Sequence, residues 1–394
     1  MEKKLAAVAA AVFAISACSK DREPVTPAVV PQLSLSADPD AEIIPGRYIV
    51  TLSEGVSPKE IAAAHGVRPD FVYSRALNGF AANMPDAIRD ALLRDSRVTR
   101  VEPDGIVHAY TTQSGATWGL DRIDQRSLPL STTYSYTNDG SGVTAYIIDT
   151  GIRFDHSEFG GRAISGFDAI DGGTADDCNG HGTHVSGTVG GATYGVAKGV
   201  TLVAVRVLNC AGSGSNSQVI AGIDWVTTNH TPGAPAVANM SLGGAGNVSL
   251  DVAVQNSIAD GVSYAVAAGN GNLLGQAKNA CNPSPARVPE AMTIGASDMN
   301  DVRASFSNYG SCVDWFAPGV DITSSWFSSA TATAVLSGTS MAAPHTAGVA
   351  ALYLQSNPGA SPAAVRTALY DKTTKNIVTR SNNTVNRHLL FSDF

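Results

Sequence analysis

Short apolar runs alternate with helix-like stretches through the second part of the chain, and this pattern predicts its fold. The runs expected to form strands are VTAYIID at 143–149, TLVAVRVL at 201–208, AVANMSL at 236–242, VSYAVAA at 262–268 and AMTIGAS at 291–297. Helices are expected after His181, at 218–229, at 250–259 and from Ser340 onward. Apolar strands that alternate with helices are typical of a parallel sheet covered by helices on both faces. Residues 111–394 are therefore predicted to form an α/β domain with a mainly parallel sheet.

A smaller unit with a different element order is expected before that domain, over residues 46–110. Its expected elements are, in order, a strand at 46–52, a helix opened by the capping box SPKE, an extended run at 71–84, a helix from Pro85 and a strand at 97–110. This β-α-β-β-α-β order predicts a small α+β, ferredoxin-like domain. The segment 19–45 is rich in Pro, Ala, Ser and Asp without periodicity, so it is expected to be a flexible linker.

The first 18 residues have the layout of an export signal. They read MEKKLAAVAAAVFAISAC: a short basic start, an apolar run and then small residues, too short to span a bilayer. The last four, Ile15 to Cys18, resemble the bacterial lipobox, in which the cysteine receives a lipid and becomes the first residue. The alternative is ordinary cleavage that discards Cys18. We expect an exported protein with a membrane attachment, if any, only through a lipid on Cys18.

Composition and cysteine count narrow the function classes. With 44% hydrophobic and 15% charged residues the chain can bury a sizeable core, and a net charge of −8 with no basic run argues against a nucleic-acid partner. Four cysteines besides Cys18 in an exported chain favour disulfides over metal binding. Three pairings are possible; each neighbouring pair closes a loop of moderate length, so Cys178–Cys210 and Cys281–Cys312 are the simplest choice.

Asp149 lies at the end of an expected strand and His181 at the start of an expected helix, and both positions suggest catalysis. Asp149 ends a strand in the turn Asp-Thr-Gly; an aspartic protease would need a second such turn, and the chain has none. His181 lies between glycines in NGHGTH. Zinc binding by Cys178, His181 and His184 is an alternative, but the glutamate of His-Glu-x-x-His is missing. A general base is the favoured interpretation of His181.

Ser340 and Asn270 are the other two candidates. Ser340 opens a helix whose first turn is expected to contain Pro344; a serine there is often only a cap, but the positive end of the helix dipole would also stabilise charge on its oxygen. The chain has no Gly-x-Ser-x-Gly elbow, which argues against an α/β-hydrolase esterase. Asn270 follows the strand at 262–268, where its amide could donate to an oxyanion or simply stabilise a turn.

Four motifs together resemble the subtilisin-like serine proteases, in particular the proteinase K and aqualysin group: IIDTGI, NGHGTHVSGT, AAGN and GTSMAAPH. The resemblance extends from Gly46, where the small unit is similar to the family's inhibitory propeptide, nearly to the last residue. It implies a three-layer subtilisin-like fold and serine endopeptidase activity. It also implies that Ser340 is the nucleophile, His181 the base and Asp149 the group that orients it, with Asn270 and the Ser340 amide as oxyanion hole.

The same resemblance implies a substrate site, calcium and self-processing. The substrate-binding residues it implies are Gly212, Ser213, Gly214, Ser241, Leu242, Gly243, Ala267, Ala268 and Gly269. Main-chain pairing there would allow broad cleavage, and the small, uncharged pocket would favour apolar or aromatic side chains before the cut. The implied structural calcium ligands are Asp314 with the carbonyls of Pro289 and Ala291 at one site, and Asp121, Asp124 and Gln125 at another. The implied cysteine pairs are those favoured above.

Taken with the lipobox, the resemblance predicts a lipid-tethered zymogen. The propeptide would fold and inhibit the enzyme and be cut near Tyr110 and Thr111, which would release a monomeric extracellular enzyme acting on proteins or peptides. The loop GNGNLLGQAKNAC beside Asn270 is longer than in aqualysin and could alter substrate access. The non-enzymatic alternative, an inactive fold kept as an exported binding protein, predicts loss of a triad member; Asp149, His181, Asn270 and Ser340 are all present.

Overall fold

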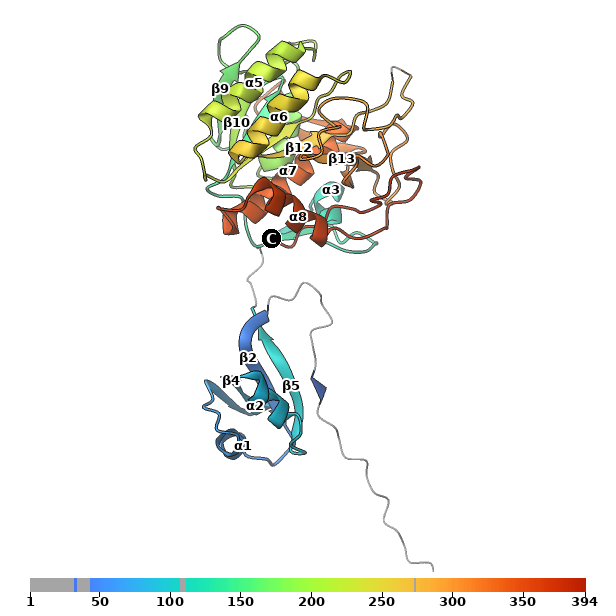
Figure 1. Ribbon diagram of the computed structural model, residues 1–394. Helices are drawn as coiled ribbons and strands as arrows, with labels where there is room; N and C mark the ends of the chain where they lie inside the picture. Colours follow the sequence, from blue (N-terminus) through green and yellow to red (C-terminus); the bar gives the residue numbers. More distant parts are fainter. Residues whose placement is uncertain (1–31, 34–42, 107–110, 273) are drawn as a thin grey trace, which may run out of the picture. The chain divides into compact units, whose positions relative to one another are not determined.

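The computed structural model describes residues 32–33, 43–106, 111–272 and 274–394 (Figure 1). The predicted signal segment with Cys18, most of the predicted linker and Tyr110 of the predicted cleavage junction lie outside the described residues. The chain divides into two compact units, Met1–Val107 and His108–Phe394, and each is described by itself.

The N-terminal unit has the β-α-β-β-α-β order expected from its sequence. Its elements are β2 (Ile43–Leu52), α1 (Pro58–Ala64), β3 (Phe71–Ser74), β4 (Asn78–Asn83), α2 (Asp86–Leu92) and β5 (Val98–Gly105). The extended run at 71–84 is thus two strands, which pair antiparallel. Ser57 caps α1 by accepting from the Glu60 amide at 3.4 Å. Both helices pack on the sheet around a core that includes Val50, Ile61 and Phe80.

The predicted linker 19–45 contains strand residues at two places, because β2 already begins at Ile43 and a short strand precedes it. Gln32 and Leu33 form a short strand, β1, which pairs parallel to β5 at Arg100 and Val101. The sheet order is therefore β1-β5-β2-β4-β3, with β1 at one edge. An exposed strand edge offers unpaired backbone groups to any extended segment nearby, which is why two residues without helical or strand periodicity can pair there.

The C-terminal unit is built on a seven-stranded sheet in which every neighbouring pair is parallel, in the order β14-β13-β12-β11-β8-β10-β9. The strands are β8 (Thr144–Asp149), β9 (Ala163–Asp168), β10 (Thr201–Arg206), β11 (Ala236–Met240), β12 (Ser263–Ala267), β13 (Met292–Ser297) and β14 (Trp315–Pro318). Strands β11, β12 and β13 are buried throughout, as expected for a sheet covered on both faces.

Helices form a layer on each face of this sheet, which confirms the three-layer prediction. On one face lie α5 (Asn216–Asn229) and α6 (Val248–Asp260), and on the other α4 (His181–Gly190) and the long α7 (Thr339–Ser356), followed by α8 (Pro362–Lys372) (Figure 1). Each face has its own hydrophobic core. Ile148 and Val205 of the sheet share one core with Ile223 of α5, and Ile147 shares the other with Val185 of α4 and Leu352 of α7.

Several elements were not expected from the sequence. They are β9, β14, the short helix α3 (Trp118–Ile123), α8 and two antiparallel pairs, β6 (Thr111–Ser114) with β7 (Thr133–Tyr136) and β15 (Ile322–Ser325) with β16 (Thr333–Leu336). Strands β6, β7 and β15 are rich in Ser and Thr, and β14 is only four residues long, so apolar periodicity alone does not mark them. Within the described residues no helix combines the length and apolar character needed to cross a membrane.

Candidate active site

The candidate catalytic residues meet beyond the carboxyl ends of the central strands. Asp149 is the last residue of β8, Ser241 directly follows β11, and Asn270 comes three residues after the end of β12. His181 begins α4 and Ser340 lies in the first turn of α7, the two helices that pack together on one face. Parallel strands place their carboxyl ends at one edge, so residues distant in sequence gather there.

Asp149 and His181 form a hydrogen-bonded pair. The Asp149 side chain is fully buried, and its Oδ1 lies 2.8 Å from His181 Nδ1, whereas the His181 side chain is 26% exposed. Burial lowers the pKa of His181, but the charge and hydrogen bond of Asp149, with a contribution from Asp177, outweigh it and hold the pKa above its usual value. Because Nδ1 donates to the carboxylate, the other ring nitrogen, Nε2, is free to accept a proton.

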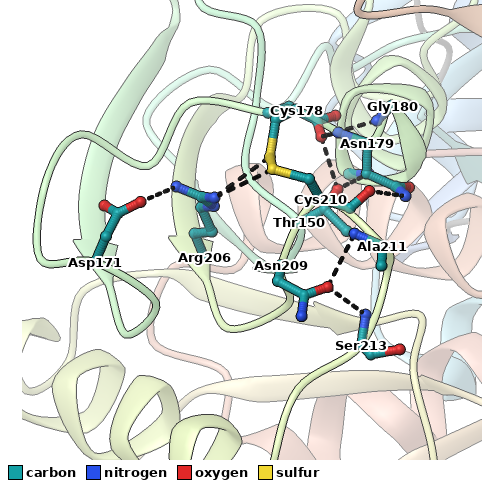
Figure 2. Close-up of a disulfide and its surroundings, with 12 residues drawn as sticks. Thr150, Asp171, Cys178, Asn179, Gly180, Arg206, Asn209, Cys210, Ala211 and Ser213 are labelled. Atoms are coloured by element: carbon teal, nitrogen blue, oxygen red, sulfur yellow. Dashed lines mark hydrogen bonds and ion pairs between the residues drawn. A yellow bond between two sulfur atoms is a disulfide. The ribbon is translucent and has the colours of Figure 1, made fainter.

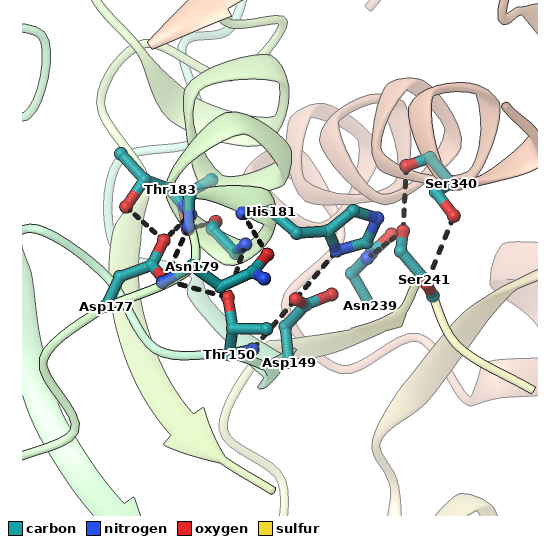
Figure 3. Close-up of polar contacts among 12 residues, drawn as sticks. Asp149, Thr150, Asp177, Asn179, His181, Thr183, Asn239, Ser241 and Ser340 are labelled. Carbon is teal, nitrogen blue, oxygen red and sulfur yellow. Dashed lines mark hydrogen bonds and ion pairs between the residues drawn. The ribbon is translucent and has the colours of Figure 1, made fainter. Parts of the chain in front are cut away.

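The start of α4 is fixed by side chains that bind its first three amides. The amide of His181 donates to Asn179 Oδ1 at 3.2 Å, that of Gly182 to Thr150 Oγ1 at 2.9 Å and that of Thr183 to Asp177 Oδ2 at 2.9 Å. Figure 3 shows these contacts around the His181 side chain. They replace the usual cap, because the N-cap residue is a glycine.

That glycine, Gly180, is required by its surroundings. Its φ is 108°, a conformation that side chains disfavour, and an added Cβ would lie 2.5 Å from the Trp326 ring and 2.6 Å from the Phe327 ring. Any other residue would therefore displace either the aromatic pair or the start of α4.

A disulfide joins the approach to His181 to the loop that carries Gly212 and Ser213 (Figure 2). The structure forms the two disulfides favoured by the sequence, Cys178–Cys210 and Cys281–Cys312. Asn179 Nδ2 donates to the carbonyl of Cys210 at 3.0 Å, parallel to the first disulfide. The loop before the candidate base and the loop expected to bind substrate are thus covalently and non-covalently linked.

The helix of Ser340 begins one residue earlier than predicted, at Thr339, so Pro344 lies inside α7 and not in its opening turn. A proline inside a helix leaves the carbonyl four residues before it without an amide partner. That carbonyl belongs to Ser340, and the Ser241 hydroxyl donates to it at 2.8 Å. The prediction that Pro344 lies in the first turn of the helix is therefore wrong. The Ser340 carbonyl, which Pro344 leaves without an amide partner, is hydrogen-bonded instead by the side chain of the residue that follows β11.

The Ser340 hydroxyl donates to the backbone carbonyl of Ser241 at 3.1 Å, so in this conformation its proton points at that carbonyl and not at His181. In Figure 3 the His181 side chain extends from α4, with Asp149 on one side and the Ser340 end of α7 on the other. A rotation about the Cα–Cβ bond of Ser340 is the change that would redirect its hydroxyl.

Asn270 is oriented by the residue that precedes Ser340. Its Oδ1 accepts from both the amide and the hydroxyl of Thr339, each at 2.9 Å, and the Thr339 hydroxyl in turn accepts from the Gly269 amide at 3.0 Å. Because two donors occupy the oxygen, the opposite end of the side chain is the N–H₂ group, which is a donor. This end lies near Gly338 at the edge of a hollow that Asn270 and Ser340 both line.

Two hollows adjoin along Ser241 to Gly244. The first, of about 500 Å³, is lined by His181 and by Gly212, Ser213 and Gly214. The second, of about 610 Å³, is lined by Asn270, Ser340 and the residues Ala267, Ala268 and Gly269. Ser241, Leu242 and Gly243 line both. The structure thus brings every residue implied for substrate binding to one of these two hollows.

The residues considered for zinc have other partners. Cys178 is in a disulfide, and His184 Nε2 lies 3.0 Å from the carbonyl of Ile322 and 3.2 Å from that of Ala334. Burial lowers the pKa of His184 to about 4, so this ring is neutral and donates from Nε2. His184 therefore supports the packing of α4 on the β15–β16 pair.

The first set of implied calcium ligands does not fit a metal in this structure. The buried Asp314 carboxylate pairs with the Arg366 guanidinium through Oδ1 and accepts from the Thr293 amide at 2.7 Å through Oδ2. Burial raises the pKa of Asp314. A cation bound by Asp314, Pro289 and Ala291 would have to displace Arg366, so nothing further is derived from this set.

The second set fits better. Asp124 Oδ2 accepts from the Ser135 amide at 2.7 Å, whereas its Oδ1 is buried without a hydrogen-bond partner among the described residues. Burial raises the pKa of Asp124 to about 6, with a further contribution from the charge of Asp121. Asp121 accepts three bonds from Ser131 and Thr132. An orphaned carboxylate oxygen beside a second carboxylate suits a hard cation.

Gln125 completes this second set only in part. Its Nε2 donates to the carbonyls of Ser127 and Pro129 at 2.7 and 2.9 Å, which leaves its Oε1 as the group able to bind a metal. Asp121, Asp124 and Gln125 therefore remain the ligands to consider for a structural cation.

Sequence reasoning did not assign four residues that shape the site: Thr150, Asp177, Thr339 and the hydroxyl of Ser241. Thr150 and Thr339 each sit inside a quoted motif, DTG and GTS, next to a candidate catalytic residue. The signal available in the sequence was a threonine next to Asp149 and another next to Ser340, because buried hydroxyl groups need hydrogen-bond partners.

The fold and the site define a class: an α/β protein with an Asp–His pair, a helix-start serine and an asparagine amide around two adjoining hollows. Comparison with known proteins is consistent with that class. Residues 140–389 match the Subtilase family and residues 64–110 match the Peptidase inhibitor I9 family.

Similar whole proteins are an "Extracellular serine proteinase" of Thermus sp. (strain Rt41A), 50% identical over 97% of each chain, and "Alkaline serine exoprotease A" of Vibrio alginolyticus, 48% identical over 91% of this chain and 70% of that one. A solved structure described as a cold adapted subtilisin-like serine proteinase matches with a TM-score of 0.68 and 54% identity, over 71% of this chain and 99% of that one. The chain belongs to the subtilase family of serine proteinases, and its N-terminal unit carries an I9 inhibitor domain.

Proposed function

We propose that this subtilase is an endopeptidase in which Asp149, His181 and Ser340 form the catalytic triad and Asn270 contributes the oxyanion hole. The 2.8 Å bond between the buried Asp149 carboxylate and His181 Nδ1, at an edge shared with Ser340, carries this proposal. An inactive binding protein would have no need to keep a buried carboxylate on a partly exposed imidazole. The family membership supplies the reaction class, hydrolysis of peptide bonds.

The triad works by moving one proton. His181 Nε2 takes the proton of the Ser340 hydroxyl as Oγ forms a bond to the carbonyl carbon of the substrate. Asp149 stabilises the imidazolium that results. His181 then gives this proton to the leaving amine, the peptide C–N bond breaks, and a water molecule hydrolyses the acyl-enzyme by the same sequence in reverse order.

The oxyanion formed in this step needs donors already in place. The side-chain N–H₂ of Asn270 and the backbone amide of Ser340 at the start of α7 are the proposed donors, and the positive end of the helix dipole adds to them. Thr339 supports this role because its two donors hold the Asn270 oxygen and leave the nitrogen for the substrate.

The proposed substrates are extended peptides with an apolar or aromatic side chain before the cut. Gly212 to Gly214 and Ser241 to Gly243 lie outside the sheets and line the hollows, which supports pairing with a substrate main chain and broad cleavage. The small residues Ala267 to Gly269 line the second hollow, and the described lining of this hollow includes no acidic side chain. A peptide library that required Arg or Lys before the cut would contradict this preference.

We further propose that the chain is a monomeric, exported zymogen, cut by Ser340 near Tyr110 and Thr111. The I9 domain and the relative named extracellular support inhibition and export. Cys18 is the proposed lipid attachment on the propeptide side of the cut, so the mature enzyme would be soluble and extracellular. Recovery of mature enzyme stably bound to membranes would count against this order of events.

Calcium is proposed as a structural ligand held by Asp121, Asp124 and Gln125. A cation there would satisfy the buried Asp124 oxygen and stabilise the folded state by about 2.7 kcal/mol at a concentration 100 times its Kd. Thermal unfolding of the Ser340→Ala chain should shift upward with calcium relative to a chelator. Asp124→Asn should abolish the shift, whereas Asp314→Asn should retain it.

The experiment that tests the central proposal compares the full chain with its Ser340→Ala variant by intact mass and N-terminal sequence. Loss of residues up to about Thr111 only from the wild-type chain would support the nucleophile and the self-cleaved propeptide together. If both chains stay whole or both are cut, processing by Ser340 is wrong. Ester and peptide substrates, compared on the processed protein, then separate an endopeptidase from an esterase.

A further inference from the structure

A second carboxylate, Asp177, connects the two backbone segments that carry Asp149 and His181. Its Oδ1 accepts from the Thr150 hydroxyl at 2.9 Å and from the amides of Asn179 and Gly180 at 2.9 and 2.8 Å. Its Oδ2 accepts from the amide and hydroxyl of Thr183 at 2.9 and 2.6 Å. Three separate segments thus converge on one side chain: the turn after β8, the loop before α4 and the first turn of α4 (Figure 3).

The network extends from Asp177 directly to both members of the Asp149–His181 pair. Thr150 is fully buried; its amide donates to Asp149 Oδ1 at 2.8 Å, and its hydroxyl accepts from the Gly182 amide at 2.9 Å. A displacement of Thr150 would therefore move both the carboxylate of Asp149 and the residue next to His181. Asp177 fixes Thr150 by accepting its hydroxyl proton.

The five donors to Asp177 are amides and hydroxyls, all of them neutral, so these hydrogen bonds bring no positive charge to the carboxylate. This differs from Asp168, whose carboxylate pairs with the guanidinium of Arg206 at 3.0 Å. Among the described residues no ion pair is formed with Asp177, so its negative charge beside the first turn of α4 acts on His181 as well as on the backbone.

We propose that Asp177 is a positioning residue for the triad, which aligns His181 with Asp149 through Thr150 and the first turn of α4 and supplies a second negative charge to the His181 ring. This inference rests on the proposed function, because it assigns Asp177 a role in the same reaction. Asp177 acts through His181 and is not itself placed on the substrate.

The ionisable groups around His181 define what removal of this charge should do. Asp149 at the end of β8 and Asp177 before α4 both raise the pKa of His181. His184 on α4 and His345 on α7 are buried, and burial lowers the pKa of each to about 4, so both are neutral near pH 7. Loss of the Asp177 charge should therefore lower the pKa of His181, and the enzyme should keep its base deprotonated at lower pH.

The test compares three variants of the processed enzyme on a neutral peptide anilide across pH. Asp177→Asn removes the charge and one of the two acceptor oxygens. Because a misplaced catalytic group slows the reaction, kcat should fall by about tenfold to about 10²-fold with little change in KM. The acidic limb of kcat/KM should move to lower pH by a few tenths of a unit to about one unit. Thr150→Val removes only the bridging hydroxyl, so kcat should fall without that shift.

Asp176→Asn is the matched control. This neighbouring carboxylate is exposed and accepts from the Thr174 hydroxyl at 2.8 Å, so its removal takes away one charge without touching the network. It should leave kcat unchanged and move the acidic limb less than Asp177→Asn. Equal effects of Asp176→Asn and Asp177→Asn on kcat and on the limb would overturn the proposal, and so would an Asp177→Asn enzyme with wild-type kcat and pH profile.

A second measurement does not depend on turnover. The His181 pKa, followed by NMR in the full Ser340→Ala chain, should be lower with Asp177→Asn than without it. An unchanged pKa refutes the charge effect even if no variant can be processed. Absence of any peptide cleavage by the wild-type chain would instead contradict the proposed function, and the NMR comparison would still decide the role of Asp177.

Discussion

The two halves of the site are held in place by different kinds of interaction. The His181 half depends on carboxylates: Asp149 binds the ring, and Asp177 binds the turn and helix start around it. The Ser340 half depends on neutral hydrogen bonds: the Ser241 hydroxyl binds the Ser340 carbonyl, and Thr339 holds the Asn270 oxygen. One half is electrostatic and the other is geometric.

This difference predicts which measurements each half should control. Charge on the His181 side sets the protonation of the base, so changes there should alter the pH profile as well as the rate. The Ser340 side contains no charged group among the residues named above, so changes there should alter kcat or stability at constant pH dependence. The following substitutions are chosen to break or sharpen this contrast.

The largest effect is expected for Asp149→Asn. An asparagine can donate to His181 Nδ1, which would favour the tautomer with its proton on Nε2 and prevent that nitrogen from accepting the Ser340 proton. Loss of the correct tautomer in a serine protease triad lowers kcat by about 10⁴-fold, and a fall of this order is expected here. Steady-state kinetics on a peptide anilide would measure it. Asp155→Asn, at an exposed carboxylate paired with Arg153, is the charge-matched control and should retain activity.

Asn270→Ala should have the next largest effect, a fall in kcat of about 10² to 10³-fold with KM nearly unchanged, because one oxyanion donor is lost. Alanine also removes the acceptor for Thr339, so Asn270→Asp is the sharper variant. Aspartate keeps the oxygen that Thr339 binds and replaces the N–H₂ donor with an oxygen that cannot donate; it also adds a negative charge, so kcat is compared at the pH optimum of each variant. Near wild-type kcat in Asn270→Asp would mean that Asn270 only holds Thr339, contrary to the proposed role.

The sequence predicted the layers of the fold and the catalytic candidates for the same physical reason. Buried parallel strands such as β11, β12 and β13 are apolar at most positions, and polar residues such as Asp149 and Asn270 stand out where those strands end. A short polar strand such as β15 leaves no comparable pattern, because its burial depends on packing against α4.

The supporting contacts could not be predicted in the same way. The bond from the Ser241 hydroxyl to the Ser340 carbonyl joins residues 99 positions apart and exists because Pro344 lies inside α7. A one-residue error in the helix start and the assumption that Pro344 belongs to the first turn were enough to hide it. The five donors to Asp177 come from three segments, and only the folded chain shows that they meet on one carboxylate.

The smallest effect is expected for Ser241→Ala, which tests the geometric half directly. The Ser340 carbonyl would lose its partner inside the protein, at a cost of about 1 kcal/mol in the free energy of unfolding. Denaturant unfolding in the Ser340→Ala background measures this without self-digestion, because the backbone carbonyl at position 340 is retained. Ser213→Ala, at an exposed serine in the first hollow, is the control and should change stability less.

A substitution in α7 tests the prediction for Ser241→Ala in a second way. Pro344→Ala would supply an amide able to bond the Ser340 carbonyl within α7, so the Ser241 hydroxyl would no longer be its sole donor. The loss caused by Ser241→Ala should therefore be smaller in a Pro344→Ala background than in the parent chain, which is a coupling that a double-mutant cycle measures. Additive effects would mean that the Ser241 hydroxyl does not compensate for the proline, and that the neutral half of the site is held by Thr339 and Asn270 alone.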